Sequence, residues 1–363
     1  MLTQFIHSVP AWALGERAFS AKFGGNIVTA GIPEVSNRLL AVKKLSKRLG
    51  LKGAEELRSS GHILHEIRTS IGKYKKHNSP MAISYHDLRS GIYNEKYPRW
   101  VAMTAPQFGF KGAERGGILS KDPADRVMAK DLHMEAIEWS QKLESEGLGA
   151  GINIWWPAWT ARRVDDPDSP PIEFQKAWDM MLAFWVDVLG KTGGTMWLEW
   201  KPGDPGIDYL MTLKLAIEFC NAVNAVLGRI AMFINNEFAH ILLSGIDVAE
   251  GVKMTIDAGL FSMFVHGNSG QMLPTSIQSM LDSGTQPEDI PILIDWDWAV
   301  GVGGPETWED QQEAVGLMDR AGQEVIYFEH DVNPAGQNPA NVFELSIRNF
   351  WKMLRHMRGV IET

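Results

Sequence analysis

The sequence has little cysteine, no excess of positive charge and no long apolar run. It contains one cysteine, Cys220, which lies in an apolar run and is expected to be a packed core thiol. An intrachain disulfide cannot form, so we expect a reducing compartment. The formal charge of −9 argues against a nucleic-acid partner, because phosphate binding needs clustered Lys and Arg. No segment reaches the ~20 apolar residues that a membrane helix requires, and the N-terminus shows no secretory pattern. These absences predict a cytoplasmic protein that binds neither nucleic acid nor a membrane.

The sequence does contain a regular alternation of short β-rich runs with longer helical patterns. Strands are predicted at residues 5–12, 81–87, 99–108, 151–156, 196–201, 229–237, 260–268 and 324–331. A long helix is predicted over 122–146, with Asp122 as its N-cap and Pro123 in its first turn. Strands that alternate with helices favour a parallel sheet, and eight such units predict an α/β fold, a (β/α)₈ TIM barrel, with residues 1–363 as a single domain. An open doubly wound sheet is the alternative, but no glycine-rich phosphate loop supports it.

Acidic and imidazole side chains gather where the predicted strands end, on the barrel face that carries chemistry. In chain order the clusters are Tyr85-His86-Asp87, Glu199-Trp200-Lys201, Glu237 with His240, His266-Gly267-Asn268, Asp295-Trp296-Asp297 and Glu329-His330-Asp331. A single carboxylate at such a position is often a helix N-cap, and a lone histidine more often packs than binds a ligand. Six clusters at one mouth are harder to explain in that way, because so many carboxylates would repel one another without cations.

The mixture of carboxylates with one or two imidazoles suits Mn²⁺, Mg²⁺ or Co²⁺. The spacing predicts two such ions, with Glu237 shared between them, and two ions a few ångströms apart can polarise a carbonyl and activate a bound water. The expected ligands of one ion are Glu199, Glu237, His266 and Asp331, and those of the other are Glu237, His240, Asp295 and Asp297.

Several of these segments, taken together and in order, resemble the xylose isomerases over about residues 80–335. The segments are SYHDL, TAPQFGFKG, NIWWPAW, WLEWKPGDPGIDYL, NNEFAHILLSG, HGNSGQ, IDWDW and FEHDVNP. Two positions depart from that family. His266 stands where xylose isomerases have an aspartate and is more like the L-rhamnose isomerase branch, and Arg89 stands where an aspartate would orient the ring-opening histidine.

The resemblance implies a role for each remaining candidate. Lys201 would donate to the carbonyl oxygen of the sugar as negative charge grows there; the alternative is a barrel-rim lysine that pairs with the carboxylates. His86 and Asp87 would open the sugar ring. Trp156 and Phe108 would form apolar walls, although plain packing explains either residue as well. Contacts to the sugar are also expected from Asn268 and Trp12.

The function implied by the resemblance is a metal-dependent aldose–ketose isomerase that moves a hydride between C1 and C2 of an open-chain sugar. Two other functions remain open in the same barrel. A single-metal sugar epimerase, or the catalytic subunit of a C-glycoside-cleaving enzyme, would not need Asp295 or Asp297. A sugar-binding barrel without turnover would not need Lys201 or complete metal spheres. The expected partner is a small-molecule sugar, and the expected assembly is a homo-oligomer, a dimer or tetramer.

Overall fold

In the computed structural model, the strands of the described residues form two parallel arcs that meet at Asn235. The structure describes residues 2–10, 17–22, 26–30, 47, 49–50, 57–60, 101–105, 117–157, 172–202, 209–269, 299–302, 305–332 and 339–360. One arc has the strand order β4 (Leu57–Ser60), β1 (Gln4–Pro10), β11 (Val325–His330), β10 (Phe264–Gly267), β9 (Asn236–Glu237). The other has the order β5 (Ala102–Thr104), β6 (Ile152–Trp155), β7 (Met196–Leu198), β8 (Met232–Ile234).

The two arcs make one continuous series because β8 and β9 are separated by a single residue. The backbone N–H of that residue, Asn235, donates to the carbonyl of Leu198, with a nitrogen–oxygen distance of 2.9 Å. All pairings within the two arcs are parallel. The series therefore runs through eight strand positions from β4 to β5, as the predicted (β/α)₈ barrel requires.

Seven of the eight predicted strands coincide with strands of the structure. The eighth, predicted at 81–87, lies outside the described residues, and the strand that pairs with β1 at that side is β4, which the sequence analysis did not identify. A short antiparallel pair, β2 (Arg17–Lys22) with β3 (Asn26–Ala30), was also not expected. The prediction of a single domain over the whole chain stays a prediction.

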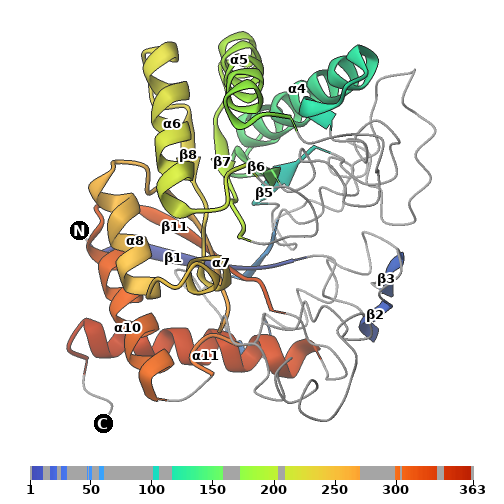
Figure 1. The fold of residues 1–363 in the computed structure, drawn as a ribbon. Coiled ribbons are helices and arrows are strands. Elements are labelled where there is room, and N and C mark those ends of the chain that lie inside the picture. Colours follow the sequence, from blue (N-terminus) through green and yellow to red (C-terminus); the bar gives the residue numbers. More distant parts are fainter. Residues whose placement is uncertain are drawn as a thin grey trace, which may run out of the picture.

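Helices follow the strands and cover the outside of the series (Figure 1). They are η5 (Gly117–Leu119), α4 (Pro123–Ser145), α5 (Phe174–Thr192), α6 (Leu213–Leu227), α7 (Phe238–Leu243), α8 (Val248–Asp257), α10 (Pro305–Arg320) and α11 (Pro339–Met357). The predicted cap of α4 is confirmed, since the Asp122 side chain accepts a hydrogen bond from the Ala124 N–H. The cap of α8 comes from another helix: Asp310 of α10 accepts hydrogen bonds from the N–H groups of Val248 and Ala249, each at 2.9 Å.

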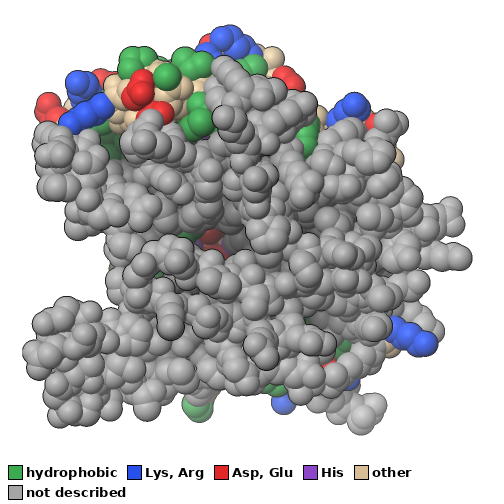
Figure 2. All heavy atoms as spheres, turned by 90° about the vertical axis from the view of Figure 1, so that its right-hand side faces the viewer, with side chains coloured by type: hydrophobic (Ala, Val, Ile, Leu, Met, Phe, Trp, Pro, Cys, Tyr) green, Lys and Arg blue, Asp and Glu red, His purple; other side chains and the backbone are tan. Residues whose placement is uncertain are grey.

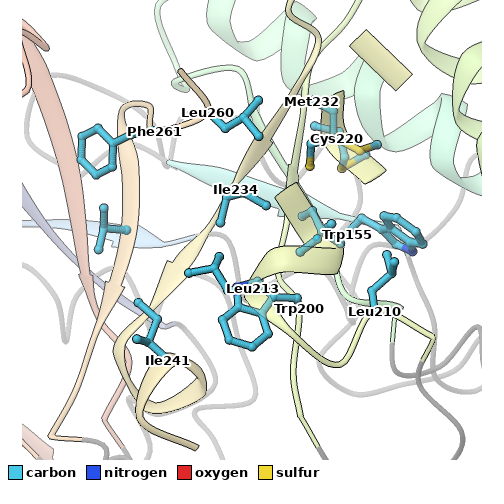
Figure 3. Close-up of a cluster of buried hydrophobic side chains, with 14 of the residues drawn as sticks. Trp155, Trp200, Leu210, Leu213, Cys220, Met232, Ile234, Ile241, Leu260 and Phe261 are labelled. Carbon is cyan, nitrogen blue, oxygen red and sulfur yellow. The ribbon is translucent and has the colours of Figure 1, made fainter. Parts of the chain in front are cut away.

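A large apolar cluster fills the space between the strands and the helices. In α6, buried residues recur every three or four positions at Leu213, Ala216, Phe219, Cys220 and Val223, which places one stripe of the helix against the sheet. Figure 3 shows part of this cluster, with side chains of α6 next to those of β6 and β8. The lone cysteine is buried there and its pKa is raised by burial, which confirms the expectation of a packed core thiol.

Three of the fourteen tryptophans, Trp155, Trp185 and Trp200, are fully buried in the same cluster. The rings of Trp155 and Trp185 lie with centroids 4.8 Å apart. Core filling accounts for these three tryptophans.

The inside of the barrel holds a separate apolar layer made by strand residues. Register partners on parallel strands face the same side, and the pairs Ile154–Trp197, Trp197–Phe233 and Phe264–Tyr327 bring their side chains together. The rings of Trp197 and Phe233 stack with centroids 5.1 Å apart. This layer closes the barrel below the strand ends, so any chemistry has to occur above it.

One buried histidine far from the strand ends makes stability depend on pH. His133 of α4 packs against Phe184 and Trp185 of α5, with ring centroids 5.7 and 4.9 Å away. Burial lowers the pKa of His133 from 6.5 to about 3, so the folded protein holds it neutral. Below pH 6.5 the unfolded chain takes up a proton that the folded chain refuses. The free energy of unfolding is therefore not reduced by this residue above pH 6.5, and it falls progressively as the pH drops from 6.5 towards 3.

Replacing His133 with leucine is expected to reduce this acid sensitivity. Between about pH 6 and 4 the free energy of unfolding of the wild type should fall more steeply than that of His133→Leu, by roughly 1.4 kcal/mol per pH unit. Denaturant unfolding at several pH values measures the slope of the free energy of unfolding against pH for each protein. The contributions of the other titrating groups cancel when one slope is subtracted from the other. Parallel slopes for the two proteins would contradict the assignment.

No helix in the described ranges is both long and apolar enough to cross a membrane.

Candidate metal centre

The polar clusters at the strand ends divide into residues that face the barrel axis and residues that face the helices. Successive side chains of a strand point to opposite sides, so Glu199 and Lys201 face one side while Trp200 packs in the outer core. The same alternation separates Glu329 and Asp331 from His330. His266 stands in register with both Glu237 and Glu329, which places these three side chains on the inner side.

The inward-facing residues bring three carboxylates to one imidazole nitrogen. His266 Nδ1 lies 2.7 Å from Glu237 Oε2, 3.4 Å from Glu199 Oε2 and 4.0 Å from Asp331 Oδ2. All four side chains are buried. Among the described residues, Glu199, Glu237 and His266 form the group whose possible ligand atoms all lie within 4.8 Å of one another. Figure 2 views the molecule from the right-hand side of Figure 1, and acidic atoms are visible within a hollow near its middle.

Two asparagine side chains brace this cluster. The Asn235 amide donates to Glu199 Oε2 and lies 3.1 Å from both that oxygen and His266 Nδ1. The Asn268 amide donates to Glu237 Oε1, and its backbone carbonyl accepts a hydrogen bond of 2.8 Å from Gln311 of α10. The carboxylates are therefore held in place by neighbours and not only by one another.

The arrangement fits a divalent cation better than it fits a proton. A proton on His266 Nδ1 can be shared with one carboxylate oxygen at a time, which leaves the other buried carboxylates to repel one another. A cation among these atoms would be bound by all of them. Ligand atoms at Mg²⁺-type bond lengths of 2.0–2.1 Å in an octahedral site lie roughly 3 Å apart, close to the two shorter distances. Carboxylate oxygens with one imidazole suit Mn²⁺, Mg²⁺ or Co²⁺, and the one cysteine is in the core.

Lys201 lies over the ring of Trp156. Lys201 is 9% exposed, and its Nζ lies 5.3 Å from the centre of the Trp156 ring. A cation held over an aromatic face is stabilised by the ring's electron density. The lysine is thus held against Trp156 and does not extend into solvent, as an ordinary rim lysine would.

His240 is a predicted ligand of the second ion, together with Glu237. His240 is buried in the short helix α7, and it does not belong to the group formed by Glu199, Glu237 and His266. Its expected partners in a second ion site, Asp295 and Asp297, lie outside the described residues, so the number of ions is not determined by these contacts. The remaining predicted site residues outside the described ranges are Trp12, His86, Asp87 and Phe108.

His330 faces the helices and belongs to a different set of contacts. Its Nε2 lies 2.8 Å from His7 Nδ1, and its Nδ1 lies 2.7 Å from Ser346 Oγ. Burial lowers the pKa of His7 to about 3 and that of His330 well below its usual value, where the neighbouring His7 adds to the effect. Two neutral histidines thus tie β1 and β11 to α11.

A glycine leaves room for the Phe328 ring beside β10. A Cβ placed on Gly267 would lie 2.0 Å from that ring, so the ring can pack against β10 in this way only because residue 267 has no side chain. His266 and Asn268, on either side of Gly267, are positioned by this contact.

Two residues that contact the cluster, Asn235 and Glu329, had no role assigned to them from the sequence. Both differ by two positions from predicted ligands, since Asn235 precedes Glu237 and Glu329 precedes Asp331. A strict period of two along each strand places the members of each pair on the same side. That periodicity was the signal that could have found them.

No protein-family model and no curated protein sequence matches the chain. Solved structures do. An L-ribulose 3-epimerase matches with a TM-score of 0.59 at 12% identity, over 97% of this chain and 95% of that one. A D-psicose 3-epimerase from Clostridium cellulolyticum H10, with D-tagatose, matches with a TM-score of 0.54 at 12% identity, over 98% and 99%. An AP endonuclease of family 2 from Brucella melitensis matches with a TM-score of 0.52 at 12% identity, over 94% and 96%.

Identities this low establish a shared fold and no shared reaction, and enzymes with different reactions occur among the matches. The matches extend over almost the whole length of the chain and of its neighbours, in agreement with the strand order and the helical cover described above. The chain therefore shares the fold of these structures, in agreement with the (β/α)₈ barrel that the sequence predicts.

Proposed function

We propose that the protein is a sugar epimerase that uses one divalent metal ion. The observation that carries this proposal is the convergence of Glu199, Glu237 and Asp331 on His266 Nδ1 at the carboxyl ends of the strands. Two of the solved structures with this fold are named as sugar 3-epimerases, which supports the same choice. One-metal chemistry needs only residues of this cluster, whereas the isomerase needs a second set of ligands.

The residues would hold the ion and the substrate in the following way. Glu199, Glu237, His266 and Asp331 would bind the cation, which would bind oxygens of the sugar and acidify the C–H bond beside its carbonyl. Lys201 would donate a hydrogen bond to a substrate oxygen as negative charge develops on it. The Trp156 face, next to Lys201, would limit the access of water to that oxygen.

Epimerisation requires a base on each face of the reacting carbon. Glu199 follows β7 and Asp331 follows β11, so they come from opposite ends of the run of strands β7, β8/β9, β10 and β11. One carboxylate would remove the proton from carbon, and the other would return a proton to the opposite face of the planar enolate. The C–H bond broken is replaced by a C–H bond of inverted configuration, and no oxidant or reductant is consumed.

The experiment that tests this function combines metal counting with a substrate screen. Metal-free protein is titrated with Mn²⁺, Mg²⁺ and Co²⁺, and ketoses and aldoses are incubated with each loaded form and analysed for products. We expect about one ion per chain and the conversion of a ketose into its epimer. Two ions with aldose–ketose conversion would replace the proposal by the isomerase. Tight sugar binding without product would replace it by a binding protein.

A further inference from the structure

We propose that Glu329, two residues before Asp331 on β11, is a positioning residue that makes His266 bind metal through Nδ1. This inference rests on the metal-binding part of the proposed function and is independent of which sugar is converted. Glu329 is fully buried on β11 and stands in register with His266, on the same inner side of the barrel. Its Oε1 lies 3.9 Å from His266 Nε2, on the side of the ring away from Glu237 and Glu199.

The tautomer of His266 decides whether it can bind a cation. A neutral imidazole carries one proton, and only the nitrogen without it offers a lone pair to a metal. Nδ1 is the nitrogen that faces the carboxylate cluster, so the proton has to be on Nε2. Metal-binding histidines in proteins are usually fixed by a carboxylate or carbonyl that accepts the proton of the other ring nitrogen.

The contacts at Nδ1 depend on whether a cation is bound. Glu237 Oε2, 2.7 Å away, can only accept, so without a cation it favours a proton on Nδ1, and a cation bound between the two atoms would replace that proton. The Asn235 amide, 3.1 Å away, is a donor and favours an accepting Nδ1. At Nε2, the carboxylate of Glu329 faces the ring, and a carboxylate there favours a proton on that nitrogen. The separation of 3.9 Å is longer than a direct hydrogen bond, so the interaction acts through charge, or through one bridging water.

The surroundings of Glu329 increase its effect on the ring. Glu329 and His266 are both fully buried, and charges interact more strongly there than at the surface because water does not screen them. Ser8 of β1 is in register with Glu329, and its buried Oγ has no hydrogen-bond partner among the described residues. A hydroxyl on the same inner face is a suitable donor to a carboxylate or to a bridging water.

The test compares the Mn²⁺ affinity of two variants. Glu329→Gln keeps the shape of the side chain and removes its charge, and we expect the dissociation constant for Mn²⁺ to rise roughly 10–100-fold. Asp310→Asn is the matched control: it neutralises a partly buried carboxylate that caps α8 and does not belong to the cluster. The control should lose stability while it keeps the wild-type Mn²⁺ affinity. Isothermal titration calorimetry measures both constants, and thermal melting followed by circular dichroism reports folding.

A second measurement determines the tautomer of His266 in the wild type, so that the proposal can be tested even if Glu329→Gln does not fold. Protein labelled with ¹⁵N-histidine and loaded with diamagnetic Mg²⁺ is studied by long-range ¹H–¹⁵N correlation, with His266→Gln used to assign the signals. We expect a protonated Nε2 and an unprotonated Nδ1. A protonated Nδ1 in the loaded protein, or an unchanged Mn²⁺ affinity in folded Glu329→Gln, would overturn this proposal alone. A wild type that binds no Mn²⁺ would overturn the proposed function as well.

Discussion

Glu237→Gln is expected to lose its bound Mn²⁺ and to lower kcat/KM about 10³-fold or more. The physical reason is that both carboxylate oxygens of Glu237 are engaged. Oε1 accepts from Asn268, and Oε2 lies 2.7 Å from His266 Nδ1. Glutamine has one oxygen, so either its NH₂ group faces the Asn268 donor or it donates to His266 Nδ1 and occupies the lone pair that the metal needs. Loss of the cation removes several kcal/mol of transition-state stabilisation, and each 1.4 kcal/mol is tenfold in rate.

Metal content measured by elemental analysis, together with epimerase activity at saturating Mn²⁺, tests this expectation. Thermal melting shows whether the variant is folded. If Glu237 bridged two ions, the variant would lose two ions per chain and not one, so the same measurement also separates the isomerase from the epimerase. A folded Glu237→Gln protein with full metal content and activity would remove Glu237 from the site.

Separate substitution of the two proposed bases is expected to slow epimerisation strongly, while each variant keeps proton exchange on one face of the reacting carbon. Glu199→Gln and Asp331→Asn should each lower the rate of epimer formation by 10²–10⁴-fold, the usual range for a lost general acid or base. In D₂O, however, each variant retains one carboxylate, on one face of the reacting carbon. It should therefore exchange the C–H proton of one epimer for deuterium and leave the other epimer unlabelled.

The two variants control for each other, because both lose a carboxylate that lies near His266 Nδ1. A loss caused only by weakened metal binding would affect exchange with both epimers equally and would be relieved by more Mn²⁺. Opposite preferences of Glu199→Gln and Asp331→Asn for the two epimers would support the assignment of one base to each face. Equal loss of exchange with both epimers at saturating Mn²⁺ would contradict it.

Local sequence pattern was sufficient to find most of the strands of this protein but not the strand beside β1. Runs such as 151–156 and 229–237 are apolar and bounded by glycine or polar residues, so they stand out as buried strands. The sequence of β4, Leu-Arg-Ser-Ser, has no such signal. Its pairing with β1 depends on where the preceding chain returns to the sheet, and this is a tertiary property.

The candidate site could be predicted as a set of residues and not as an arrangement. Glu199, Glu237 and His266 were identified because they follow strands whose carboxyl ends meet at one mouth, and the structure brings them together. His240 is a histidine like His266 and is only three positions from Glu237, yet it is not part of the group formed by Glu199, Glu237 and His266. A helical turn separates the two, and the direction of a side chain that leaves the strand cannot be obtained from spacing alone.

The sequence by itself determined that this chain alternates strands with helices, contains a packed core thiol and gathers carboxylates and imidazoles behind its strands, because periodicity and composition are local properties. Only the tertiary structure decided which of those groups converge on His266 Nδ1, and that Asn235 and Glu329 lie at the two ends of the same ring. Such contacts join residues from β7, β8/β9, β10 and β11, and they depend on strand register and barrel closure. Those features arise from packing over the whole chain and leave no mark in any single segment.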